Sequence, residues 1–131
     1  RSAAIFLAGG TLPIRPGLCY DKAGAFRRTE RRIYMQWVDF HLHTDASEDC
    51  DASPLAMCDA AVEKGLYAIA VTDHVEMLEY TTVYASCLET SWRYTGELVP
   101  RYAGRLRIAR GIELGEPLYD LPRTEQLLRD L

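Results

Sequence analysis

The sequence lacks any apolar run long enough to cross a membrane. The longest near its start, AAIFLAGG at residues 3–10, is far shorter than the roughly 20 residues that a membrane-spanning helix needs. It also lacks the cationic stretch and cleavage site of a secretory signal. CxxC pairs are absent as well, which favours free thiols in a reducing, cytoplasmic setting over a disulfide framework. This applies to Cys19, Cys50, Cys58 and Cys87, of which Cys58 is expected to serve packing.

An excess of positive charge is also missing. The net charge is -4 at neutral pH, whereas a protein that binds the nucleic-acid backbone usually shows a basic face or a high pI. Nucleic acid is therefore not the expected partner. The 131 residues contain no internal repeat or low-complexity tract, and 48% of them are hydrophobic, which suits one small globular domain or a piece of a larger one.

A sustained hydrophobic period is absent from residues 1–34, which mix Gly, Pro and Arg. We expect this segment to be an extension that is not part of the domain. One hypothesis makes Met35 the biological start, because codons AGGAGG for Arg31 and Arg32 would form a ribosome-binding sequence; the nucleotide sequence would decide this. The alternative is an ordinary flexible N-terminal extension.

From Trp37 onward, short apolar strands alternate with helical segments. The first strand is expected to be short and buried, and the second is apolar enough to be buried on both faces of a parallel sheet. Ser53 and Pro54 mark a helix start and Gly65 its end, while Pro100 is expected to kink or break the second helix. The order predicts an α/β fold, a parallel sheet or barrel, with strands over 37–41, 66–72 and 105–113 and helices over 54–64, about 88–103 and after Pro122.

Each of the three predicted strands ends in residues that carry imidazole or carboxylate groups. These ends are HLH, TDH and GIE at residues 41–43, 72–74 and 111–113. In parallel α/β folds, function gathers at the carboxyl ends of the strands. The chain has only three histidines, and all of them fall at these ends. Imidazole and carboxylate together suit Zn, Fe or Mn. The sequence therefore predicts a metal site that includes His41, His43, His74 and Glu113.

Other acidic residues near these strand ends have different expected roles. Asp49, on the loop after the first strand, is the next candidate ligand. Asp39 and Asp73 are better placed to accept hydrogen bonds that orient the imidazoles, although either could instead cap a local turn. The remaining acids of the loop are expected to be solvated: Asp45, Glu48 and Asp51.

The runs HLHTDASED, LYAIAVTDHVE and RIARGIELG resemble the PHP (polymerase and histidinol phosphatase) family, most closely its histidinol-phosphate phosphatase branch. The resemblance covers about residues 37–117. It implies the N-terminal portion of a distorted seven-stranded β/α barrel, similar to a TIM barrel, that holds two or three divalent metal ions. By that resemblance His41 and His43 form the first ligand motif, Asp49 is the acidic loop ligand, His74 is the TDH ligand and Glu113 bridges metals.

The implied reaction is metal-dependent hydrolysis of L-histidinol phosphate to L-histidinol and phosphate in histidine biosynthesis. The family's later histidine and Asp-x-His motifs are expected beyond residue 131. Residues 35–131 are accordingly expected to be the N-terminal part of the domain, inactive and poorly stable alone.

Two other functions stay open at this stage. One is a nucleotide or nucleic-acid phosphoesterase of the same family, and the other is a non-catalytic, PHP-like metal-binding module. The sequence assigns no phosphate-clamping residue, since Arg107 and Arg110 are expected to be strand or packing-edge residues. Metal identity and oligomeric state are also not fixed by sequence.

Overall fold

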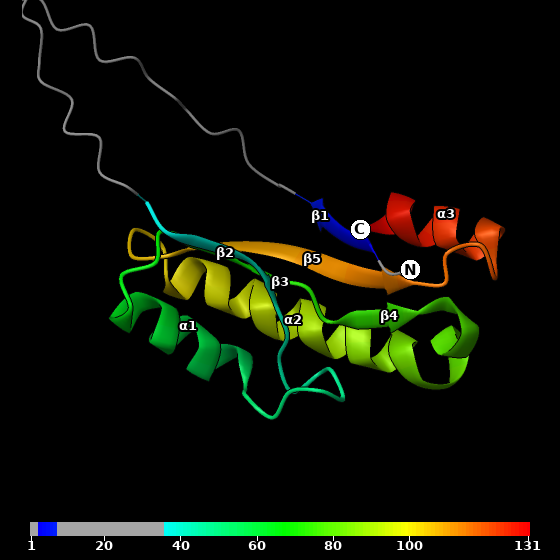
Figure 1. Cartoon of the computed structure of the whole chain (residues 1–131), viewed down its shortest axis with the longest axis horizontal. Coiled ribbons are helices and arrows are strands. Elements are labelled where there is room, and N and C mark those ends of the chain that lie inside the picture. Colours follow the sequence, from blue (N-terminus) through cyan, green and yellow to red (C-terminus); the bar gives the residue numbers. More distant parts are fainter. Residues whose placement is uncertain (1–2, 8–35) are drawn as a thin grey trace, which may run out of the picture.

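A computed structural model of the chain describes residues 3–7 and 36–131. The described residues form a sheet with helices packed on it (Figure 1). A 3₁₀ helix (Met77–Glu79) and a π-helix (Tyr80–Tyr84) precede α2. The other elements, in chain order, are β1 (Ala3–Leu7), β2 (Val38–Leu42), α1 (Pro54–Glu63), β3 (Ala68–Val71), β4 (His74–Glu76), α2 (Ala85–Arg101), β5 (Arg107–Gly115) and α3 (Leu121–Asp130).

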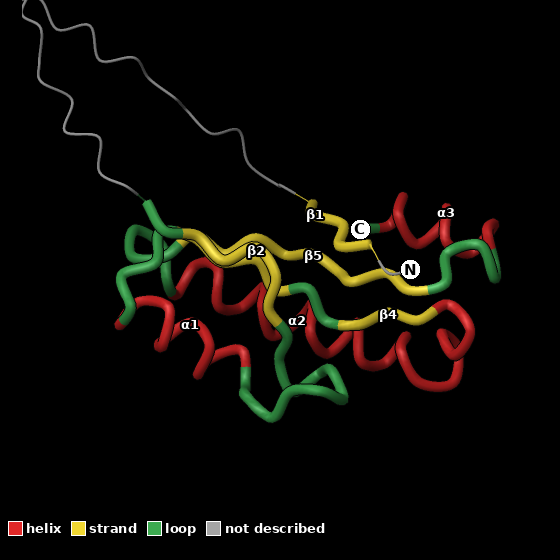
Figure 2. The backbone as a smooth tube through the Cα atoms, viewed as in Figure 1, coloured by secondary structure: helices red, strands yellow, loops and turns green. Residues whose placement is uncertain are grey.

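The sheet has the strand order β1-β5-β3-β2, and β4 also pairs with β5. β2, β3, β4 and β5 pair in parallel. Together with the helices that lie beside the strands (Figure 2), this pairing confirms the predicted α/β class with a parallel sheet. β3 and β4 lie one after the other along the same edge of β5, because they pair with its residues 107–110 and 113–115 respectively. A two-residue break at Thr72 and Asp73 separates them.

The predicted helices form, with small changes at their ends. Ser53 caps α1 by accepting a hydrogen bond from the Ala56 amide at 3.2 Å, and Gly65 follows the helix with a positive φ of 71°. The second helix begins at Ala85, earlier than predicted. Pro100 lies inside it and does not break it before Arg101; at the end of a helix, a missing backbone donor disturbs only the last turn.

The first predicted strand is not buried. It forms as β2, but four of its five residues are exposed, and the side chains of Val38 and Phe40 are 42% and 50% exposed. The physical reason is its position, since β2 lies at the end of the strand order and, among the strands that the structure describes, pairs only with β3. In contrast, all four residues of β3 are buried, as predicted.

Residues 3–7 belong to the segment that the sequence sets apart from the domain. They form β1, which pairs antiparallel with β5 from Arg110 to Leu114, and the sequence did not predict this strand. Whether 35–131 is the domain boundary stays a prediction. The hypothesis of a start at Met35, the two arginines before it and Cys19 lie outside the described residues.

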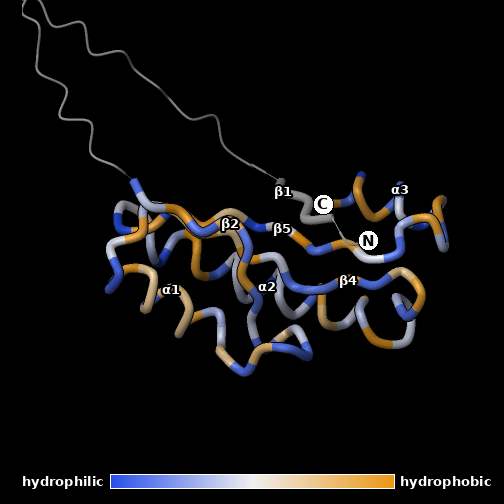
Figure 3. The backbone as a smooth tube through the Cα atoms, in the orientation of Figure 1, coloured by the Kyte–Doolittle hydropathy of each residue, from blue (hydrophilic) through white to orange (hydrophobic). Residues whose placement is uncertain are grey.

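Two groups of buried apolar side chains form the core between the sheet and its helices. One joins α1, β3 and α2 and includes Cys58, Ile69 and Tyr102. The other joins β4, α2, β5 and α3 and includes Val75, Ile112 and Leu127. In the second half of β5 the buried Ile112 and Leu114 lie on either side of Glu113, and Figure 3 shows the hydropathy changing along the strand. Glu113 therefore points to the face opposite the core.

Cys58 packs in this core, as the sequence predicted. Its side chain is fully buried, and burial raises the pKa of the thiol to about 11. Within the described ranges, Cys50, Cys58 and Cys87 are all free thiols. No helix in the described part of the chain has both the length and the apolar character that a membrane span requires.

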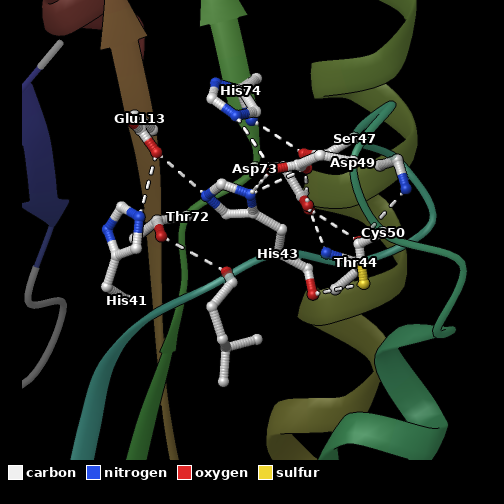
Figure 4. A network of polar contacts seen from close by, with 12 residues as sticks. His41, His43, Thr44, Ser47, Asp49, Cys50, Thr72, Asp73, His74 and Glu113 are labelled. Atoms are coloured by element: carbon white, nitrogen blue, oxygen red, sulfur yellow. Dashed lines mark hydrogen bonds and ion pairs between the residues drawn. The ribbon is translucent and has the colours of Figure 1, made fainter.

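The carboxylate of Asp73 fastens the loop after β2 to the rest of the fold (Figure 4). It sits in the break between β3 and β4 and is only 3% exposed. Four groups donate hydrogen bonds to it: the amide and hydroxyl of Thr44 at 2.6 and 2.8 Å, the Ser47 hydroxyl at 2.9 Å, and the Ser91 hydroxyl from α2. The loop, the sheet and α2 are thereby joined at one buried anion.

Replacing this carboxylate by an amide should therefore destabilise the chain. Asp73→Asn keeps the shape but turns an amide NH₂ group toward donors, so we expect a loss of at least about 2 kcal/mol in the free energy of unfolding. Urea unfolding followed by circular dichroism measures it. The matched control is Asp45→Asn, the same change at an exposed position of the same loop, expected to stay within about 0.5 kcal/mol. Equal effects of the two substitutions would contradict the anchoring role of Asp73.

Candidate metal centre

Five side chains predicted from the sequence come together at one end of the parallel strands (Figure 4). His41 lies in β2, His43 directly follows it, and Asp49 lies on the next loop. His74 opens β4 and pairs in register with Glu113 of β5. Because paired residues on neighbouring strands carry their side chains side by side, this register puts His74 and Glu113 at the same level of the sheet.

Glu113 lies between the two histidines of the HLH motif. Its Oε2 atom is 3.1 Å from Nε2 of His41 and 3.0 Å from Nε2 of His43. The His43 and Glu113 side chains are 13% and 16% exposed, whereas His41 is 52% exposed. The first strand is irregular here, since its register with β3 shifts between Asp39 and Leu42, yet both imidazoles still reach the same carboxylate oxygen.

Asp49 approaches the cluster from the other side. Its two carboxylate oxygens lie 2.9 and 3.0 Å from Nδ1 of His43, and Oδ2 lies 3.5 Å from Nε2 of His74. The hydrogen bond with His43, helped by the charges of His43 and His74, holds the pKa of the Asp49 carboxyl below its usual value against a smaller opposing effect of burial. The carboxylate is therefore ready to act as an anionic ligand.

His43 is shared by both halves of the cluster. Its two ring nitrogens each face a carboxylate, Asp49 at Nδ1 and Glu113 at Nε2. A neutral imidazole has one N–H donor and one lone pair, so it can donate to only one of them. The other contact needs a second proton or a metal ion between nitrogen and oxygen. When one nitrogen ligates an ion, the other is placed to donate to the opposite carboxylate, the usual arrangement for a metal-bound histidine.

The donor atoms fit a divalent ion in two overlapping groups. Atoms of His41, His43 and Glu113 lie within 4.8 Å of one another, and so do atoms of His43, Asp49 and His74. Ligands on a tetrahedral zinc ion, at bond lengths of about 2.0–2.1 Å, are about 3.3 Å apart. The nitrogen–oxygen distances of 3.0 and 3.1 Å around Glu113 are close to that value. Mixed imidazole and carboxylate donors suit Zn, Fe or Mn.

Asp39 and Asp73 contact other groups than the imidazole rings that the sequence suggested. Asp39 accepts a hydrogen bond from the backbone amide of His41 at 3.1 Å, a local contact within β2. Asp73 holds the loop through Thr44 and Ser47, and the Ser47 hydroxyl in turn accepts a hydrogen bond from the His74 amide at 3.0 Å. Asp73 therefore fixes the backbone of the loop at Thr44 and, through the Ser47 hydroxyl, the backbone at His74. The other acids of the loop are exposed, as expected: Asp45, Glu48 and Asp51.

Sequence reasoning missed Glu76, whose Oε1 lies 3.3 Å from Nδ1 of His74. The signal was available in the TDHVE run, because residues two apart on a strand point to the same face. No strand was predicted after TDH, so Glu76 was not expected on the same face as His74.

The two arginines of β5 that the sequence assigned to strand or packing-edge positions contact aromatic rings. The guanidinium of Arg110 lies 3.9 Å from the ring centre of Trp92 and donates a hydrogen bond to its carbonyl at 2.7 Å. That of Arg107 lies over Tyr67. Both are packing contacts. In the part of the chain that the structure describes, no ion pair joins an arginine or lysine to the cluster.

Comparison with curated proteins found no match to this chain. Among solved structures, the chain is similar to histidinol phosphate phosphatase (HisK) from Lactococcus lactis subsp. lactis Il1403, crystallised in complex with zinc, L-histidinol and phosphate. The identity is 19%, the TM-score is 0.60, and the match covers 73% of this chain and 36% of that chain. This chain thus spans little more than a third of the solved protein, and the likeness shows a shared fold.

Comparison with models of protein families gives a match over most of residues 36–131. The model of the PHP domain matches residues 39–129, well over half of the chain. That range includes all five residues of the cluster. The chain therefore belongs to the PHP domain family.

Proposed function

We propose that this chain supplies part of the metal centre of a phosphomonoesterase that hydrolyses L-histidinol phosphate to L-histidinol and phosphate in histidine biosynthesis, in the cytoplasm. The observation that carries the proposal is the cluster itself, in which three imidazoles face two carboxylates at the ends of parallel strands. Membership of the PHP domain family supports metal-dependent phosphoester chemistry. The similar HisK structure, which held zinc, L-histidinol and phosphate, supports the substrate.

Divalent ions held here would neutralise phosphate oxygens and activate water for attack on phosphorus. The chain's own residues hold the ligand atoms in position. Glu113 brings the donor nitrogens of His41 and His43 to one point, and Asp49 fixes the opposite nitrogen of His43. Asp73 keeps the loop that carries Asp49 from moving away. No protein nucleophile is needed for this kind of hydrolysis.

The proposal extends to the composition of the whole centre. We propose that residues 35–131 form the N-terminal part of the PHP domain and that further ligands come from a longer form of the protein, giving two or three divalent ions. The coverage of 36% of the HisK chain supports this. A small phosphorylated substrate is favoured over nucleic acid because the net charge is -4. The alternatives are a nucleotide phosphoesterase and a metal-binding module without catalysis.

The first test is metal binding by the chain itself. Zinc affinity is measured by competition with a chelating dye, and bound zinc by elemental analysis after dialysis. Glu113→Gln removes the carboxylate that contacts His41 and His43, so we expect at least about 100-fold weaker binding, beyond the effect of losing an outer contact. The control is Glu63→Gln, at an exposed position on α1, which should bind as the unaltered chain does. Equal zinc affinity in both variants would exclude Glu113 as a ligand.

The second test concerns the substrate. Phosphate release from L-histidinol phosphate and from a nucleoside monophosphate is compared, with zinc or manganese added, for the chain and for a longer form that carries the rest of the domain. We expect the longer form to prefer L-histidinol phosphate and the chain alone to be inactive. Glu113→Gln in the longer form should lower kcat at least about 100-fold, because the ions would be lost or misplaced.

Different results in that assay point to the alternatives. Faster release from the nucleotide would replace the proposed substrate while keeping the metal chemistry. Zinc binding without release of phosphate from either compound would favour the non-catalytic module. Turnover by the chain alone that equals that of the longer form would contradict the division of the centre between the two parts.

A further inference from the structure

Glu76 lies beside the cluster and has no role in the function proposed above. It ends β4, whose residues His74 and Glu76 are two apart and therefore point to the same face of the sheet. Val75 between them is fully buried in the core on the opposite face. The geometry of β4 thus directs the Glu76 carboxylate to the side on which His74 meets Asp49.

The His74 ring has one nitrogen whose bonding is incomplete. Its Nδ1 atom is buried and makes no well-aligned hydrogen bond, and the nearest carboxylate oxygen, Oε1 of Glu76, lies 3.3 Å away. A buried polar atom without a partner is costly. Its Nε2 atom, on the other side of the ring, faces Asp49 at 3.5 Å. A small rotation of either side chain would turn the contact with Glu76 into a hydrogen bond.

Gly115 provides the space in which the Glu76 carboxylate lies. The two residues pair directly across β4 and β5. A Cβ atom at position 115 would overlap the carboxylate of Glu76, so any residue with a side chain would push that carboxylate aside. Gly115 has no positive φ, so backbone freedom does not explain why a glycine stands here. The observed place of the Glu76 carboxylate, in contrast, depends on the missing side chain at position 115.

We propose that Glu76 is a positioning residue for His74. Its carboxylate accepts a hydrogen bond from Nδ1–H, which keeps the proton on Nδ1 and leaves the lone pair on Nε2, the nitrogen that faces the metal centre. Histidines that ligate metals generally donate their other N–H to a carboxylate or carbonyl, which fixes the tautomer and the ring orientation. The effect on metal binding rests on the function proposed above, but the tautomer of His74 does not.

The tautomer is tested on the ¹⁵N-labelled chain without metal, by NMR correlation of the ring nitrogens with the ring protons. It is recorded at about pH 9, above the ordinary imidazole pKa of about 6.5. We expect the Nδ1–H form of His74 in the unaltered chain. Glu76→Ala should give a mixture of both forms, and Gly115→Ala should do the same because it displaces the carboxylate without removing its charge. The control is Glu79→Ala, an exposed glutamate three residues further on, which should change nothing.

Zinc affinity gives the second readout. Glu76→Ala and Gly115→Ala should each weaken zinc binding by about 10- to 100-fold, with an unchanged number of bound ions. Glu76→Gln should weaken it less than Glu76→Ala, because its amide oxygen can still accept the hydrogen bond from Nδ1–H. An unchanged His74 tautomer in Glu76→Ala would overturn the proposal. So would the loss of a whole ion, because Glu76 would then be a ligand. Failure of the unaltered chain to bind zinc would instead contradict the proposed metal centre, whereas the tautomer result would still decide whether Glu76 positions His74.

Discussion

A single buried carboxylate holds the parts of this site in place. Asp73 sits where β3 stops and β4 begins, and it receives four hydrogen bonds from the loop after β2 and from α2. A buried anion with so many donors tolerates little movement, because any shift leaves polar groups unpaired. The loop that carries Asp49 and the helix that covers the sheet are therefore fixed relative to the break between the two strands.

The pairing with β5 keeps its register across that break, because Val71 pairs with Arg110 and His74 pairs with Glu113, three residues further along each strand. The alternation of faces therefore also continues from Ala68 through Thr72 and Asp73 into β4. Here Asp73 turns into the fold, and its carbonyl still accepts a hydrogen bond from the Glu113 amide at 3.0 Å. β4 then resumes with His74 opposite Glu113. This alternation buries Asp73 against α2 and presents the next residue, His74, to Asp49 on the other face of the sheet.

The residues of the cluster could be predicted from the sequence, whereas the contacts of the residues that support them could not. His41, His43, His74 and Glu113 follow apolar strands, and the ends of parallel strands meet whatever their exact register. The contacts of Asp73 and Glu76 could not be predicted, because those of Asp73 depend on how the loop after β2 and α2 fold over it, and that of Glu76 depends on a strand after TDH that was not predicted. The exposure of β2 was missed for another reason: an apolar strand sequence does not say whether a neighbour will cover its outer edge.

The shared position of His43 makes the two halves of the cluster interdependent. An ion that takes the Nε2 lone pair, beside Glu113, leaves the proton on Nδ1 and so gives Asp49 a hydrogen-bonded partner instead of a fellow ligand. An ion that takes Nδ1 does the reverse. This one ring could therefore give its lone pair to only one half of the cluster, and an ion in the other half would depend on other donors.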